Sequence, residues 1–256
     1  MRRRSLALIL AVVLMSAACG QDGNPAASGP PATVEPDGDR PVAVWRLEGG
    51  FLPPGLLAIR PPRVVVYGDG RAIVDAARTV RLSEAELSDL VSALDRDLSG
   101  QPATATPRPG TPVVMDAPTT VLGVRTAGGS LREVRIPALD ESGDGYAGPL
   151  LNARARLDRL AQRAAAEGRG YSSDRVRLVA EEAEARDGKV RPWPEGVPEP
   201  PDAGSPVRTR DLSGNAAQSA IQLIPADSGQ RGGWPVFRAP SGAMLALSWR
   251  YLLPDE

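Results

Sequence analysis

The chain has 256 residues, with 30 Lys and Arg against 31 Asp and Glu, a net charge of −1, 42% hydrophobic residues and 4% aromatic residues. This apolar content is sufficient for a buried core and excludes a globally disordered chain. There is no histidine, and Cys19 is the only cysteine. The sequence therefore excludes histidine acid–base chemistry, a Ser-His-Asp triad, a His/Cys zinc site and an internal disulfide.

The first 18 residues have the layout of a secretory signal peptide. Arginines at positions 2–4 form a positively charged start, and an apolar segment follows at 6–15. A permanent membrane span needs roughly 20 apolar residues, so this segment is too short to be one. The small residues at 16–18 then predict a cleavage site before Cys19.

The position of Cys19, directly after three small residues, makes this region resemble a bacterial lipoprotein signal. The resemblance implies that the thiol of Cys19 carries a diacylglyceryl group and that Cys19 is the mature N-terminus. Two acyl chains are enough for stable attachment, so we expect the protein at the cell membrane, on its extracytoplasmic face. Ser16 stands where these signals usually have leucine, so release by an ordinary signal peptidase remains the alternative.

Residues 19–40 predict the lipidated N-terminus and a disordered tether, because they are rich in Gly, Pro, Ser and Asp and lack a hydrophobic period. Removal of residues 1–18 takes away three arginines and changes the net charge from −1 to −4. A mildly acidic domain is a poor match for nucleic acid. The expected partners are the membrane, through the lipid on Cys19, and an envelope protein or polymer.

Residues 41–256 predict one α+β extracytoplasmic domain. Strands or hairpins are expected at 42–47, at 63–75 with a turn at 68–70, at 119–136 with a turn at 128–129, at 174–182, at 207–212, and at 234–253 with a turn at 241–242. Helices are expected after Ser83, which forms a capping box with Glu86, at 149–166 and after Ser213. Residues 174–182 also fit a helix, and 186–206 predict a loop.

These elements favour an antiparallel sheet built from β-hairpins, with two or three helices packed on one face. Residues 243–249 are apolar at nearly every position, which predicts a strand in the middle of the sheet.

Five short segments resemble a family of uncharacterised lipoproteins and secreted proteins from actinobacteria. They are GGFLPP at 49–54, VYGDGR at 66–71, MDAPTT at 115–120, KVRPWP at 189–194 and YLLPDE at 251–256. The resemblance implies an extracytoplasmic α+β domain and brings no established activity with it. Many members of that family carry an extra cysteine pair in the C-terminal half, which this chain lacks.

Three residues are candidates for a site. Asp69 and Asp116 are loop-borne acids, and glycoside hydrolysis needs two carboxyl groups a few ångströms apart; both positions also suit turn or loop roles. Trp193, between two prolines, fits either an aromatic binding anchor or a cover for the edge of the core. No metal site is expected, because the calcium-loop-like run at 140–145 has Leu151 where the closing glutamate is required. No cofactor is expected either.

The sequence thus predicts a lipid-anchored extracytoplasmic protein that acts as a non-enzymatic binding or scaffolding module of the cell envelope. A carboxylate-based hydrolase of envelope glycans, with Asp69 and Asp116 as its acids, is the alternative. No catalytic residue is assigned, and whether the protein is an enzyme stays open.

Overall fold

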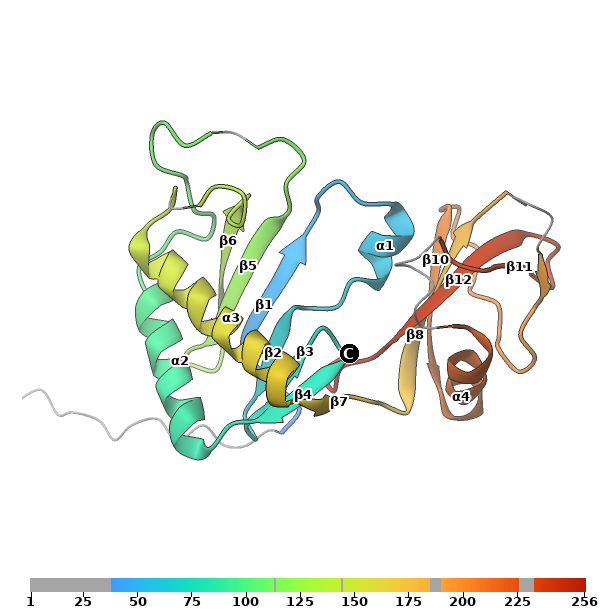
Figure 1. Cartoon of the computed structure of the whole chain (residues 1–256), viewed down its shortest axis with the longest axis horizontal. Coiled ribbons are helices and arrows are strands. Elements are labelled where there is room, and N and C mark those ends of the chain that lie inside the picture. The colour runs from blue at the N-terminus through green and yellow to red at the C-terminus, as the bar shows by residue number, and fades with distance from the viewer. Residues whose placement is uncertain (1–37, 113, 144, 185–189, 226–232) are drawn as a thin grey trace, which may run out of the picture. The chain divides into compact units, whose positions relative to one another are not determined.

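The computed structural model describes residues 38–112, 114–143, 145–184, 190–225 and 233–256 (Figure 1). The predicted signal peptide, Cys19 and most of the tether lie outside the described residues. The chain from residue 38 onward belongs to one compact unit. It has an α+β fold, as predicted, with two mostly antiparallel sheets and four helices among the described residues. None of these helices combines the length and apolarity that a membrane crossing requires.

The first sheet has seven strands in the order β6-β5-β1-β2-β3-β4-β7, and every neighbouring pair is antiparallel. The strands are β1 (Pro41–Glu48), β2 (Val64–Tyr67), β3 (Arg71–Val74), β4 (Arg78–Arg81), β5 (Thr119–Arg125), β6 (Leu131–Pro137) and β7 (Arg169–Gly170). The hairpins predicted at 63–75 and 119–136 are β2–β3 and β5–β6. The first of them continues into β4, which the sequence analysis missed.

Two helices cover one face of the first sheet (Figure 1). They are α2 (Glu84–Leu98) and α3 (Gly148–Glu167). The capping box that begins α2 is present: the Glu86 N–H donates to Ser83 Oγ, and the Ser83 N–H donates to Glu86 Oε2. The apolar side of α3 is formed by Leu150, Leu157 and Leu160, which are buried in one cluster with strand residues such as Trp45. Burial of this stripe is what holds α3 on the sheet.

The second sheet has the order β10-β8-β12-β11-β9. Its strands are β8 (Arg175–Glu182), β9 (Arg191–Pro192), β10 (Val207–Ser213), β11 (Val236–Arg238) and β12 (Met244–Tyr251); β9 and β11 are parallel and the other pairs antiparallel. Helix α4 (Gly214–Leu223) packs on one face through Ala217 and Ala220. The nearly apolar strand β12 is central, as predicted, and residues 175–182 form a strand rather than a helix. Ser213 precedes α4, but its side chain makes no capping hydrogen bond.

The strands divide between two sheets, where the sequence analysis expected one. The physical reason is that β8 pairs with β10 and β12, which follow it, and with none of the strands before it. Turn residues and alternation predict which neighbours form a hairpin, but they contain no information on which sheet a hairpin joins. The short helix α1 (Pro54–Ile59), which was also missed, packs against β8: a Cβ on Gly55 would lie 2.5 Å from Glu181 Oε2 and 2.8 Å from the Trp234 ring.

The segment after β12, residues 252–256, contacts both sheets, and we call it the C-terminal clasp. On the first sheet, the Tyr67 hydroxyl donates to Asp255 Oδ1 at 2.6 Å, and Leu253 is buried beside Tyr67. On the second, both Nη atoms of Arg250 lie 2.6 Å from the carboxylate oxygens of Glu256. Five residues therefore join strands that are far apart in the sequence.

We expect Gly70→Ala to destabilise the protein by about 3 kcal/mol or more. Gly70 has φ +85°, and an added Cβ would lie 2.6 Å from the Leu82 carbonyl oxygen, which belongs to the backbone. The matched control is Gly129→Ala in the β5–β6 turn: its φ is +80°, but nothing lies within 4 Å of the added atom. Strain alone should cost the control about 1 kcal/mol. Urea unfolding midpoints compare the two, and equal losses would contradict the close approach.

We expect Glu256→Gln to lower the free energy of unfolding by about 2 kcal/mol at pH 7, because it leaves the buried Arg250 guanidinium without its counter-charge. Burial alone would raise the pKa of Glu256, but hydrogen bonds from Arg250 and the Leu253 N–H outweigh it and hold that pKa below 4.5. A carboxylate with a depressed folded pKa stabilises the fold above its unfolded pKa and loses that contribution as the pH falls.

The stability difference between the wild type and Glu256→Gln should therefore shrink as the pH falls below about 4.5. Glu167→Gln is the control, because the Glu167 side chain is 71% exposed and lies 3.5 Å from Arg163. This control should change stability by less than about 0.5 kcal/mol. A difference for Glu256→Gln that does not vary with pH would show that the clasp does not depend on this charge.

Candidate functional site

Asp69 and Asp116 lie at opposite ends of β1. Asp69 is in the β2–β3 turn, beside the start of β1, because Tyr67 pairs with Pro41. Asp116 precedes β5, beside the end of β1, because Thr119 pairs with Glu48. An eight-residue strand spans more than about 20 Å, whereas glycosidase carboxyl groups lie about 5–10 Å apart. The hypothesis that these two acids form a catalytic pair is therefore wrong.

Asp69 has a structural role in the turn that it occupies. Its Oδ1 accepts the Arg71 N–H at 2.9 Å, and its Oδ2 lies 2.6 Å from Arg71 Nε. Trp193 is half-buried at the edge of the core that α4 covers. Its indole N–H donates to the Val197 carbonyl at 2.6 Å, so the polar atom of the ring is already satisfied. The geometry favours the structural interpretation for both residues.

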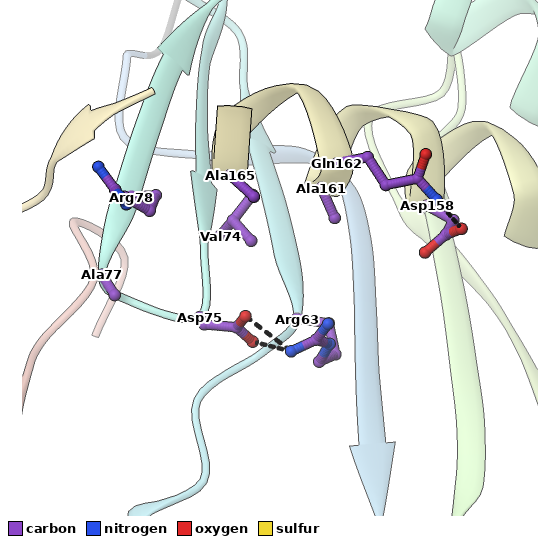
Figure 2. A pocket seen from close by; sticks show the side chains of 9 residues that line it. All are labelled: Arg63, Val74, Asp75, Ala77, Arg78, Asp158, Ala161, Gln162 and Ala165. Atoms are coloured by element: carbon purple, nitrogen blue, oxygen red, sulfur yellow. Dashed lines mark hydrogen bonds and ion pairs between the residues drawn. The ribbon is translucent and has the colours of Figure 1, made fainter. Parts of the chain in front are cut away.

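A hollow of about 270 Å³ with both apolar and charged lining residues lies between α3 and the turn that follows β3 (Figure 2). It brings together two carboxylates, Asp75 and Asp158. Arg63 Nη1 lies 2.7 and 2.6 Å from the two oxygens of Asp75, and Asp158 accepts from Gln162 at 2.8 Å. Arg154 is also 3.4 Å from Asp158. Burial raises the pKa of Asp75, although Arg63 opposes this. Because each carboxylate already has an arginine partner, the hollow does not offer a free acid and a free base.

An apolar groove of about 600 Å³ lies between the loop that follows β1 and the segment that precedes β5. Four of its lining residues are large, apolar and exposed: Phe51 (88%), Leu52 (42%), Val114 (38%) and Met115 (78%). Single exposed apolar side chains are common on protein surfaces, but a contiguous group marks an interaction surface. Arg60, Asp116 and Glu141 also line the groove. The groove thus combines apolar side chains with charges of both signs, as many binding surfaces do.

A backbone hydrogen bond joins the two loops that form the groove, the loop after β1 and the loop before β5. Gly49 and Gly50 follow β1 with φ of +63° and +89°, a conformation that glycine adopts without strain. The Phe51 N–H then donates to the Asp116 carbonyl at 3.0 Å, and Arg60 Nη1 donates to the Gly49 carbonyl at 2.9 Å. Asp116, the predicted acid, thus has a place in the groove after all. Its backbone has φ +60°, and its carbonyl accepts the bond that joins the two loops. Its side chain is exposed and lines the groove.

The four apolar residues of the groove were not among the predicted site residues, although the sequence carries a signal for them. They occur in GGFLPP and PVVMDAP, where glycine and proline prevent a regular helix or strand. Apolar side chains in such a loop cannot share the one buried face that periodicity provides, so exposure is the expectation. A hydrophobic period identifies core residues of helices and strands, but it does not identify exposed apolar residues in irregular loops.

No family model matches the chain, and neither a curated protein nor a solved structure is significantly similar to it. The resemblance to actinobacterial lipoproteins therefore stays a prediction. The described residues also include no group of three or more His, Cys, Asp or Glu side chains placed to hold a metal ion.

Proposed function

We propose that the protein is a binding module of the cell envelope, anchored through a lipid on Cys19 and holding a protein partner in the apolar groove. The convergence of Phe51, Leu52, Val114 and Met115 on one hollow carries this proposal. Each such side chain contributes roughly 1.5–3 kcal/mol when it passes from water into an apolar contact. Phe51 and Met115 are the most exposed of the four and have the most to gain.

The proposed occupant is an apolar segment of another envelope protein rather than the bilayer that holds the anchor. The described chain enters β1 at Pro41, directly after the predicted tether, and first contributes to the groove at Leu47, near the other end of the strand. The groove therefore lies near the end of β1 that is farther from Pro41, the residue that follows the predicted tether. Its lining carries both signs of charge, Arg60 against Asp116 and Glu141, which suits the mixed surface of a protein better than a uniformly anionic layer of headgroups.

Such a module would act by holding its partner, without chemical change. Burial of the apolar side chains would supply affinity, and the charged residues of the groove would fix the orientation of the partner. The two acyl chains would keep the complex at the membrane. For the alternative hydrolase, Asp69 and Asp116 are too far apart to act together, and Asp75 and Asp158 are each paired with arginine.

We expect Cys19→Ala to move the protein from the membrane fraction to the medium or periplasm, because the acyl chains then have no point of attachment. Cell fractionation with immunoblotting and mass analysis of the mature N-terminus measure this. Ser16→Leu, which restores the usual lipoprotein residue, is the control and should leave the protein at the membrane. An unmodified wild-type N-terminus, or a wild-type chain in the cytosol, would contradict the anchor.

We expect a photo-crosslinking residue in place of Met115 to join a specific envelope protein in cells, through an apolar segment of that protein. Phe51→Ser in the same chain should reduce the adduct at least tenfold, because it removes the largest apolar side chain of the groove. Leu223→Ser is the matched control: Leu223 is exposed (47%) but belongs to α4. Adducts with lipid alone, or adducts equal in both variants, would contradict a protein partner.

A further inference from the structure

The two sheets have four edges, and three of them are unsuited to accept another strand. β7 and β9 contain two residues each, and β9 ends in proline. The edge of β6 is occupied near Arg135, whose N–H donates to the Ala103 carbonyl at 2.9 Å while its C=O accepts from the Ala105 N–H at 2.8 Å. The remaining edge is β10, a regular strand of seven residues. Natural sheets usually shorten, cover, bulge or charge such edges. Among the described residues β10 is neither short nor paired on its outer side, and its charged side chains are the feature that restricts which strand can join it.

The outer side of β10 carries backbone groups without a partner among the described residues. The Glu182 N–H donates to the Pro206 carbonyl. This bond shows which alternate residues of β10 form hydrogen bonds with β8. Arg208, Arg210 and Leu212 therefore make the bonds to β8, and the N–H and C=O groups of Thr209 and Asp211 point away from it. Both residues are exposed. An added strand can bond these groups without disturbing any existing pair.

A second copy of β10 is a poor occupant for this edge. With Thr209 and Asp211 as the bonding positions, an antiparallel copy has three registers that overlap most of the strand. The register that overlaps all seven residues places the exposed Arg210 opposite Arg210. The other two place Arg208 opposite Arg210 and Asp211 opposite Asp211, where the ion pairs of Arg208 with Glu182 and of Asp211 with Arg177 reduce the repulsion. Like charges directly opposite each other across a pair of strands are destabilising. The edge therefore discriminates most strongly against the fully overlapping pairing with its own copy.

Arg210 defines the chemistry that a different strand would meet. It is exposed, and one Nη donates to the Glu199 carbonyl at 2.9 Å; no partner for its other N–H groups lies among the described residues. Toward an incoming antiparallel strand it occupies a non-hydrogen-bonded position, where facing Cα atoms come within about 4.5 Å. A carboxylate at the facing position would pair with it directly. Asp211 is already paired, since both of its oxygens lie within 3.0 Å of Arg177.

We propose that the outer edge of β10 accepts an extended segment of another protein as an additional antiparallel strand, with Asp or Glu of that segment opposite Arg210. Backbone bonds at Thr209 and Asp211 supply the affinity, and the Arg210 pair sets the register. This surface is separate from the apolar groove and does not depend on the function proposed for it.

The test places a photo-crosslinking residue at Ser213, whose side chain makes no cap bond, in the full-length protein in cells. We expect an adduct that maps to an extended, acid-containing segment of a different protein. Thr209→Pro should abolish the adduct, because it removes an outward N–H but no bond to β8. Thr209→Val keeps that N–H and is the matched control, which should retain the adduct.

Arg210→Glu leaves the backbone groups in place and should reduce the adduct at least tenfold by charge repulsion. Circular dichroism shows whether Thr209→Pro folds. If it does not, the adduct measured with Arg210→Glu still tests the proposal. Absence of an adduct, an adduct with a second copy of the chain, or an adduct equally strong in Arg210→Glu and the wild type would overturn the proposal. Persistence of the adduct in a folded Thr209→Pro variant would do so as well.

Discussion

The ion pair between Arg250 and Glu256 anchors the C-terminal clasp, which connects the two sheets. The Arg250 guanidinium is nine-tenths buried, and burying a charge is costly unless a partner with good geometry offsets it. Glu256 supplies that partner and also accepts the Leu253 N–H at 2.9 Å. These bonds fix the end of the clasp, which places Asp255 against Tyr67 of the other sheet. These polar contacts thus connect the two sheets, a role that a continuous hydrophobic core would otherwise have.

The surfaces suited to binding are those that this framework leaves uncovered. The helices and the clasp bury the broad faces of the first sheet in two clusters. What stays open is a loop region at one end of β1 and the edge of β10. The first offers apolar side chains and the second offers backbone hydrogen bonds, so the two surfaces suit different partners. Both surfaces are built from groups that can contact another macromolecule, apolar side chains in the first and backbone N–H and C=O groups in the second.

Local signals were sufficient for most of the elements. The Gly68-Asp69-Gly70 turn, the Ser83 and Glu86 capping box and the apolar stripe of α3 each involve residues close together in the sequence, and the structure has all three. The elements that were missed, α1, β4 and the two-residue strands, have too few residues for a period to develop. They form because partners distant in the sequence stabilise them, as Glu181 and Trp234 do for α1.

The sequence by itself determined the α+β class, the hairpins, the absence of histidine and disulfide chemistry, and the prediction of a lipid on Cys19, because each of these rests on composition or on neighbouring residues. Only the tertiary structure decided that the strands form two sheets, that Asp69 and Asp116 lie at opposite ends of β1, and that Phe51 and Met115 meet in one groove. These outcomes depend on which distant strands pair and in which register. That choice is made by the burial of side chains against one another and leaves no local pattern in the sequence.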